Sequence, residues 1–308
     1  MQLSDDRVWI DGCFDFTHHG HAGAILQARQ TIEGDGGTLI CGVHNDREIE
    51  MNKGTLPVMT SRERYEHTRA NRWCGEVVED APYVTQPAWL DRYGCRYVVH
   101  GDDITLDANG EDCYQEMKDI GRFRVVKRTN GVSTTEIIHR ILTGSKGSND
   151  RASLEDLKRY ASGPDGHSRH CYVFQGTLDH VLVEGNFKLC PEEFVLVRGT
   201  FDLFHMGQID QLAQVKSLEG KKIIAVIEDS NDCIMSPKER ALSVLSCRHL
   251  DGVVIQPEIK QVDYEIDDDR LTQGSEFQYL TCGVIVERIE RQRDAYVRRN
   301  VRKGMPSA

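Results

Sequence analysis

Short apolar runs alternate with longer stretches of helical periodicity through the first half of the chain. Continuous β-branched, aliphatic or aromatic residues at 8–10 and 38–43 predict two strands buried on both faces. Between them, apolar residues recur at helical spacing over residues 21–29. A strand, a helix and a second strand in this order predict a βαβ unit with parallel strands, and therefore an α/β fold.

The same alternation continues beyond this unit. Three further β-branched runs predict strands, at residues 77–78, 97–99 and 125–129. A helix is predicted to begin at Thr60 or Ser61, either of which can cap it, and to continue through Arg72 and Trp73. Its many charges are also typical of a salt-bridged surface helix. A further helix is predicted over residues 133–142, and a charged helix over residues 285–303.

The loop of residues 13–20 leads directly into the first predicted helix. Unpaired backbone N–H groups and the helix dipole favour an anion at such a helix start. His18 and His21 face the same side of the first turn, and Gly20 lets a ligand approach the backbone. These features predict a phosphate site. A zinc site and simple helix capping stay open, although no Cys pair or evident fourth ligand lies near the histidines.

Two segments carry a family resemblance. Gly12-Cys13-Phe14-Asp15, followed by His18-His19-Gly20-His21, resembles the GxFD and HxGH motifs of the cytidylyltransferase family, nucleotidyltransferases of Rossmann-like fold. HxGH is shared with class I aminoacyl-tRNA synthetases, so by itself it indicates only the superfamily. A later stretch resembles the family's RTEGISTS element, which binds nucleotide phosphates: Arg128, Thr129, Gly131, Ser133, Thr134 and Thr135.

The resemblance implies roles for individual residues. His18 and His21 would donate to the α-phosphate of CTP, and Lys53 would hold the phosphates from a predicted loop, where lysines are more often simply solvated. Arg72 would face the substrate and Trp73 would pack beside the site. Magnesium would arrive on CTP without a dedicated protein ligand. The other implied substrate-binding residues are Ile10, Asp11, Gly12, Cys13, Phe14, Asp15, Gly20, His100, Gly101, Asp102, Asp103, Arg128, Thr129, Gly131, Ser133, Thr134 and Thr135.

Asp102 and Asp103 follow a predicted buried strand. Turn residues that cap the next segment often have this composition. The resemblance implies instead that one of the two carboxylates meets the ribose, the base or the amino-alcohol end of the substrates. The sequence leaves open which of them does so.

The opening motif recurs later in the chain. Gly199 begins a copy of it 187 residues after Gly12, which indicates a duplicated domain. We therefore expect two tandem Rossmann-like parallel-sheet nucleotidyltransferase domains, a catalytic one over 1–144 and a degenerate one over 170–308, joined by a linker over 145–169. In the copy, Gln208 replaces the second histidine of the motif. The second domain is therefore expected to be catalytically silent.

Composition limits the class of protein. A length of 308 residues suits two domains, and a net charge of −11 without a long basic run argues against a nucleic-acid partner and thus against a synthetase. Ten scattered cysteines without a CxxC pair are typical of reduced thiols in the cytosol. Neither a signal segment nor a long apolar run occurs. We expect a cytoplasmic protein, at most peripheral to the endoplasmic reticulum membrane, and compatible with a homodimer.

The tandem arrangement narrows the resemblance to family members that act on phosphoethanolamine. It implies that CTP and phosphoethanolamine give CDP-ethanolamine and pyrophosphate, for phosphatidylethanolamine synthesis. Two alternatives stay open. Phosphocholine or another phosphoalcohol could replace phosphoethanolamine, since charge alone does not separate a primary from a quaternary ammonium. A nucleotide-sensing module without catalysis is the alternative from another class.

Overall fold

The computed structural model describes residues 2–34, 36–129, 131–266, 275–302 and 304. Contacts group the chain into two compact units. Unit 1 spans residues 1–131 and 164–166, and unit 2 spans residues 132–163 and 167–308. Each unit contains a mainly parallel β-sheet flanked by helices, so the predicted tandem α/β fold is confirmed.

Unit 1 is built on a parallel sheet of order β3-β2-β1-β4-β5. Its strands are β1 (Ser4–Gly12), β2 (Thr38–Val43), β3 (Glu76–Glu79), β4 (Cys95–Gly101) and β5 (Phe123–Val126). Its helices are α1 (His19–Gln30), α2 (Asp46–Lys53), α3 (Ser61–Ala70), α4 (Pro87–Arg92) and α5 (Gln115–Asp119). Since β2 and β4 lie on opposite sides of β1, the strand order reverses there. In open α/β sheets, ligands bind beyond the carboxyl ends of the strands at such a reversal.

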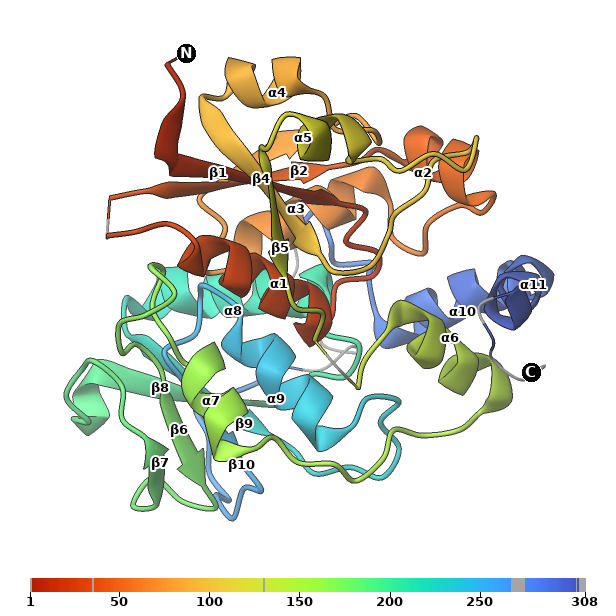
Figure 1. Cartoon of the computed structure of the whole chain (residues 1–308). Helices are drawn as coiled ribbons and strands as arrows, with labels where there is room; N and C mark the ends of the chain where they lie inside the picture. The colour runs from red at the N-terminus through yellow and green to blue at the C-terminus, as the bar shows by residue number, and fades with distance from the viewer. Residues whose placement is uncertain (1, 35, 130, 267–274, 303, 305–308) are drawn as a thin grey trace. The chain divides into compact units, whose positions relative to one another are not determined.

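Helices cover both faces of the sheet in unit 1. Figure 1 shows α4 and α5 on one face, and α1 and α3 on the other. On the first face, Trp9 is fully buried against Leu90 of α4 and Met117 of α5. Burying apolar surface contributes roughly 25 cal/mol per Å², so this layer holds β1 and its carboxyl end in place.

Unit 2 contains a sheet of order β11-β8-β9-β10-β6-β7. Its strands are β6 (Tyr172–Gln175), β7 (Val181–Val183), β8 (Phe194–Gly199), β9 (Lys222–Ile227), β10 (Gly252–Ile255) and β11 (Tyr264–Glu265). Its helices are α6 (Thr134–Thr143), α7 (Leu154–Tyr160), the 3₁₀ turn η1 (Pro191–Glu193), α8 (Met206–Glu219), α9 (Pro237–Leu245), α10 (Cys282–Arg291) and α11 (Arg293–Arg302). The order β11-β8-β9-β10 repeats β4-β1-β2-β3 of unit 1, as a duplication requires.

Two local predictions in unit 1 are wrong. Lys53 is the last residue of α2, not part of a loop, because Asn45 caps the helix by accepting from the Glu48 N–H at 2.8 Å. Arg72 lies beyond α3, whose end is fixed at Asn71: its backbone is extended and its side chain accepts from the Trp73 N–H at 3.0 Å.

Helix α6 shares its contacts with unit 2, although its sequence follows directly on that of unit 1. Its apolar face, from Ile137 to Leu142, packs in the same unit as α10 and α11. An amphipathic helix is stable only where that face is covered, so the packing partner, not the position in the chain, decides the unit.

Candidate active site

The loop after β1 is fixed by hydrogen bonds to its own unit. Phe14 is buried and takes a left-handed backbone conformation with φ of 45°. The Asp15 carboxylate accepts from the backbone N–H groups of Val58 and Met59, both at 2.8 Å. A strained residue held by such contacts sets the direction in which the loop enters α1.

Arg64 connects three segments beneath this loop. Its guanidinium is buried and donates to the carbonyl oxygens of Cys13 at 2.8 Å and His44 at 2.7 Å. It also pairs with Asp46 at 2.7 Å. The ends of β1 and β2 are thereby joined to α3. The sequence did not assign this role, although the recurrence of the same residue as Arg240 in the copy was a signal for it.

His18 and His21 lie together at the start of α1. The His18 Nδ1 atom accepts from the Gly20 N–H at 3.0 Å, so the capping interpretation is correct for His18 and its neutral ring carries the proton on Nε2. The two rings stack with centroids 4.1 Å apart. Among the described residues, the buried Nδ1 of His21 has no hydrogen-bond partner. The two imidazoles therefore lie together at a helix N-terminus.

Positive charge gathers around His21. Burial, with the charges of Lys53 and Arg128, lowers the pKa of His21 to about 3. The pKa of Lys53 is raised, chiefly by the neighbouring Cys13 thiol and against the effect of desolvation, so the ammonium stays charged. The structure therefore brings His21, Lys53, Arg128 and Cys13 to the same sheet edge. An anion there would meet the positive charges of Lys53 and Arg128, which are both exposed residues.

The turn after β4 reaches the same segment as Arg128. The Asp102 carboxylate accepts from the Arg128 N–H at 3.3 Å. Asp103 folds back over Gly101, where an added Cβ would lie 2.7 Å from the carboxylate oxygen. Asp102 therefore orders the loop that carries Arg128, and Gly101 gives Asp103 room to fold.

A buried carboxylate lies one residue before the GxFD motif. Asp11 accepts hydrogen bonds from Trp9 Nε1 at 2.8 Å, and from the hydroxyls of Thr85 and Tyr114 at 2.5 Å each. The His100 ring lies 4.5 Å from that of Tyr114. Burial and the contact with Asp11 raise the pKa of Tyr114 well above 10, so its hydroxyl keeps its proton.

Sequence reasoning missed Thr85 and Tyr114. The position of Asp11, a charged residue in a buried strand, was a signal in the sequence that its carboxylate needs hydrogen-bond donors. A buried carboxylate beside aromatic side chains is suited to an ammonium group, because both a carboxylate and the face of an aromatic ring attract positive charge. Asp11 therefore provides a negative charge in the site, whereas Lys53 provides a positive one.

The remaining predicted residues lie in different settings. Arg72 and Trp73 are buried after α3. Thr129 has a buried hydroxyl oxygen without a hydrogen-bond partner among the described residues. Ser133 caps α6 by accepting from the Glu136 N–H at 3.1 Å; together with Thr134 and Thr135 it belongs to unit 2. Ile10 and Gly12 lie in β1, Phe14 lies in the loop after it, and Gly20 lies in the first turn of α1.

Comparison with known proteins now decides the family. The family model described as cytidylyltransferase-like matches residues 9–140 and 196–299. The chain belongs to the cytidylyltransferase-like family. It is 55% identical to the ethanolamine-phosphate cytidylyltransferase of Saccharomyces cerevisiae, over 99% of each chain. The protein of that name from Dictyostelium discoideum is 41% identical over 81% of this chain and 72% of its own.

A second kind of relative matches one segment only. Choline-phosphate cytidylyltransferase 2 of Arabidopsis thaliana is 42% identical over 44% of this chain and 44% of its own. Two family segments in one chain agree with the predicted duplication. Within the described ranges, no three His, Cys, Asp or Glu side chains are grouped to hold a metal ion, and no helix is long and apolar enough to span a membrane.

The second cytidylyltransferase-like segment keeps the loop scaffold. Asp202 accepts from the backbone N–H groups of Ile234 at 2.7 Å and Met235 at 2.8 Å, as Asp15 does in unit 1. Arg240 donates to the carbonyl oxygens of Thr200 at 2.7 Å and Glu228 at 2.6 Å, as Arg64 does for its own loops. The bracing residues have therefore been retained in both copies.

In unit 2, other residues of the same unit occupy the space at the start of α8. A Cβ added to Gly207 would lie 2.2 Å from the Leu280 carbonyl oxygen. The Cys282 thiol donates to the Asp202 carbonyl at 3.1 Å, which holds the start of α10 against this loop. Since Gln208 also replaces the second histidine, this position lacks both the space and the second imidazole that unit 1 offers a phosphate.

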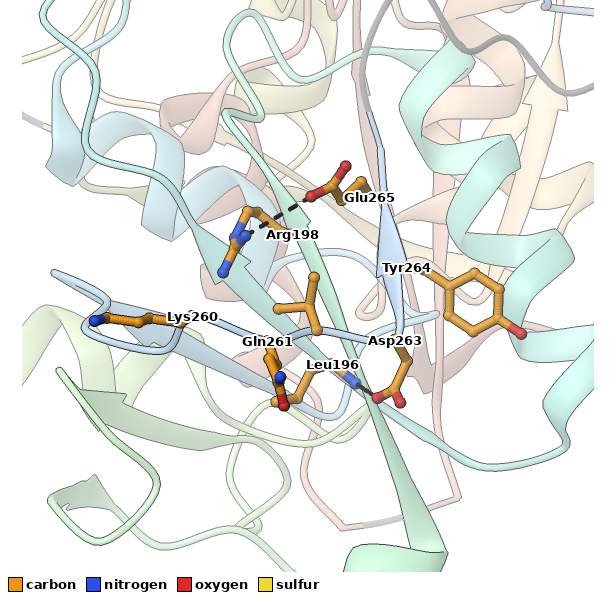
Figure 2. A pocket seen from close by; sticks show the side chains of 8 residues that line it. Leu196, Arg198, Lys260, Gln261, Asp263, Tyr264 and Glu265 are labelled. Atoms are coloured by element: carbon orange, nitrogen blue, oxygen red, sulfur yellow. Dashed lines mark hydrogen bonds and ion pairs between the residues drawn. The ribbon is translucent and has the colours of Figure 1, made fainter.

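The charge beside β8 is reversed relative to unit 1. Arg198 lies 187 residues after Asp11 and pairs with Glu228 and Glu265, at 3.7 Å each. Figure 2 shows Arg198 and Glu265 at the wall of a hollow of about 590 Å³. Its lining residues are Leu196, Arg198, Lys260, Gln261, Val262, Asp263, Tyr264 and Glu265. A guanidinium in place of the Asp11 carboxylate does not suit an ammonium group.

Proposed function

We propose that this protein transfers CMP from CTP to phosphoethanolamine, giving CDP-ethanolamine and pyrophosphate. The observation that carries the proposal is the stacked His18–His21 pair at the start of α1, with Lys53 and Arg128 acting on the same imidazole. The 55% identity to a yeast protein named for this activity, over nearly all of both chains, supports it.

In this reaction the protein mainly neutralises the negative charge of the phosphates and forms no covalent bond with a substrate. A phosphate oxygen of phosphoethanolamine attacks the α-phosphorus of CTP; a new P–O bond forms there, and the bond to the β-phosphate oxygen breaks to release pyrophosphate. His18 Nε2–H and His21 would donate to the α-phosphate oxygens as their negative charge grows. Lys53 and Arg128 would neutralise the departing pyrophosphate. Magnesium is part of the substrate, bound to the triphosphate.

Asp11 would hold the ammonium end of phosphoethanolamine. Its carboxylate is buried and is already oriented by hydrogen bonds from Trp9, Thr85 and Tyr114. With the ammonium at Asp11 and the phosphate near the histidines, the nucleophilic oxygen is presented to CTP. Positioning of this kind lowers the entropic cost of bringing two anions together.

The start of α6 would bind the triphosphate. Ser133 caps this helix, and the hydroxyls of Thr134 and Thr135 follow in its first turn. Helix N-termini bind phosphate oxygens through unpaired N–H groups. This part of the proposal rests on the resemblance of the segment to the family's nucleotide-binding element.

Incubation of the purified protein with CTP, magnesium and phosphoethanolamine tests the proposal. CDP-ethanolamine and pyrophosphate should form in equal amounts, as measured by mass spectrometry and a coupled pyrophosphate assay. An equimolar mixture with phosphocholine should yield mainly CDP-ethanolamine; mainly CDP-choline would replace the proposed acceptor. CTP binding without pyrophosphate release would instead indicate a nucleotide sensor.

A further inference from the structure

His44 follows β2 on the same face of the sheet as Asp11. Its backbone N–H donates to the Gly12 carbonyl oxygen at 3.2 Å, which continues the pairing of β1 with β2 by one residue. Side chains alternate between the two faces of a strand, so His44 shares the face of Ile40, which packs in one apolar cluster with Trp9. Trp9 in turn donates to the Asp11 carboxylate at 2.8 Å. Both polar side chains therefore lie on the face covered by α4 and α5, where β1 and β2 end.

The His44 ring is fixed in one orientation. It is 3% exposed, and its Nδ1 atom lies 3.1 Å from the Ala81 carbonyl oxygen. Since a carbonyl oxygen only accepts hydrogen bonds, Nδ1 carries the proton in this contact. Burial lowers the pKa of His44, so the ring stays neutral and its Nε2 atom is a hydrogen-bond acceptor. Among the described residues, Ala81 is the hydrogen-bond partner of this ring, which leaves Nε2 open.

The Asp11 carboxylate has room for one more donor. An ionised carboxylate offers about four lone-pair positions. Its Oδ2 atom accepts from Trp9 and Thr85, and its Oδ1 atom accepts from Tyr114. Within the described part of the chain these donors leave one position, on Oδ1. An ammonium group held by Asp11 would place one N–H there, and its other N–H groups would need further acceptors.

We infer that His44 is a specificity-determining residue, whose Nε2 atom accepts a hydrogen bond from the ammonium group of phosphoethanolamine beside Asp11. The inference rests on the proposed function and deepens it. A lone pair on Nε2 repels phosphate oxygens, so this atom suits the N–H end of the substrate and not its phosphate end. Lys53, whose charge also acts on His44, would face that phosphate.

This contact separates a primary from a quaternary ammonium. The Asp11 carboxylate attracts the positive charge of either group, and so does the ring of Tyr83, whose centroid lies 5.0 Å from that of His44. A quaternary ammonium has no N–H and would leave Nε2 without a partner. A site built to bond a substrate N–H rejects an analogue that lacks it, because the polar atom of the site is then unpaired. His44 would therefore favour phosphoethanolamine over phosphocholine.

Two substitutions of His44 test the inference, because each keeps one half of the imidazole. His44→Asn places an amide N–H near the position of Nδ1, so it keeps the bond to Ala81 and loses the acceptor. KM for phosphoethanolamine should rise about 30-fold, the usual worth of a hydrogen bond to a charged group, and the preference over phosphocholine in kcat/KM should fall in parallel. KM for CTP should stay within about twofold.

His44→Gln is the complementary variant. Its amide oxygen reaches the position of Nε2, while the bond to Ala81 is lost, so most of the preference for phosphoethanolamine should be retained. If His44 only supported the fold, His44→Gln would be the more damaging change and His44→Asn would keep the preference. That result would overturn the inference.

Tyr65→Phe is the matched control. It removes the hydrogen bond at 3.0 Å from the Tyr65 hydroxyl to Asp80, the residue before Ala81, and leaves both acceptors of the site in place. It should lower the thermal midpoint without altering the substrate preference. An equal loss of preference in Tyr65→Phe and His44→Asn would mean general loosening of this segment, and the role of His44 would be refuted.

Methylated analogues test the same point without a substitution. The N-methyl analogue of phosphoethanolamine keeps two N–H groups, one for Asp11 and one for His44, whereas the N,N-dimethyl analogue keeps one. The unsubstituted protein should therefore show its largest loss of kcat/KM between these two analogues, and His44→Asn should lack that step. An even decline with each added methyl group would indicate steric exclusion and would contradict the inference.

The unsubstituted protein also separates this inference from the proposed function. If it forms CDP-ethanolamine in preference to CDP-choline and His44→Asn retains that preference, only the role of His44 fails. If it forms mainly CDP-choline, or neither product, the proposed function fails, and the inference about His44 with it.

Discussion

The imidazole rings of His18 and His21 stack at 4.1 Å with an interplanar angle of 30°, at the first turn of one helix. His18 is committed through Nδ1 to the helix cap, and the Nδ1 atom of His21 is buried without a partner among the described residues. The His18 ring therefore caps the helix start, and the His21 ring stacks on it.

Removal of His21 should lower the rate of the chemical step. His21→Ala is expected to reduce kcat about 100-fold or more, the usual cost of losing a preorganised donor. Steady-state kinetics of CDP-ethanolamine formation would measure it. His205→Ala, in the degenerate copy, should leave turnover within a few-fold. Near-normal kcat in a folded His21→Ala protein would contradict the role.

The lowered pKa of His21 predicts an acid-sensitive fold. Below the ordinary pKa of 6.5 the unfolded chain binds a proton that the folded chain refuses until about pH 3. The free energy of unfolding should therefore fall as pH drops from about 6.5 towards 3, and His21→Gln should flatten this dependence. Thermal unfolding at several pH values would show it; parallel curves for the two proteins would refute the assignment.

Lys53 should contribute through its charge. Lys53→Met is expected to reduce kcat/KM for CTP about 100-fold, because a cation that would neutralise the phosphates is lost. Arg69→Met is the control: it removes a cation of unit 1 that pairs with Glu66 and Glu79 at the surface. The control should stay within about twofold, as is usual for surface ion pairs. Equal effects of the two substitutions would point to net charge alone.

Asp11 should distinguish the two substrates. Asp11→Asn keeps the shape of the side chain and removes its charge, so KM for phosphoethanolamine should rise about 30-fold or more. KM for CTP should change much less. Asp91→Asn, at an exposed pair with Arg122, provides the control. A uniform rise in both KM values would argue that Asp11 only supports the fold.

Local signals in the sequence were sufficient for several elements. The apolar run at 38–43 coincides with β2, and a helix does begin after Thr60, which forms a capping box with Glu63. These features depend on neighbours within four residues, so composition and spacing determine them. Lys53 shows the limit, because α2 is a polar helix whose start depends on the Asn45 cap and carries almost no apolar signal.

The sequence by itself determined the duplicated α/β architecture and the gathering of His18, His21 and Lys53 after adjacent parallel strands, since strand order and motif spacing are local. Only the tertiary structure decided the partners of Asp11, the bracing by Arg64 and the attachment of α6 to unit 2 through Arg140. Apart from the Trp9–Asp11 hydrogen bond, those contacts join residues between 18 and 103 positions apart. Their choice depends on which buried charges and apolar faces meet after folding, and no short-range pattern records it.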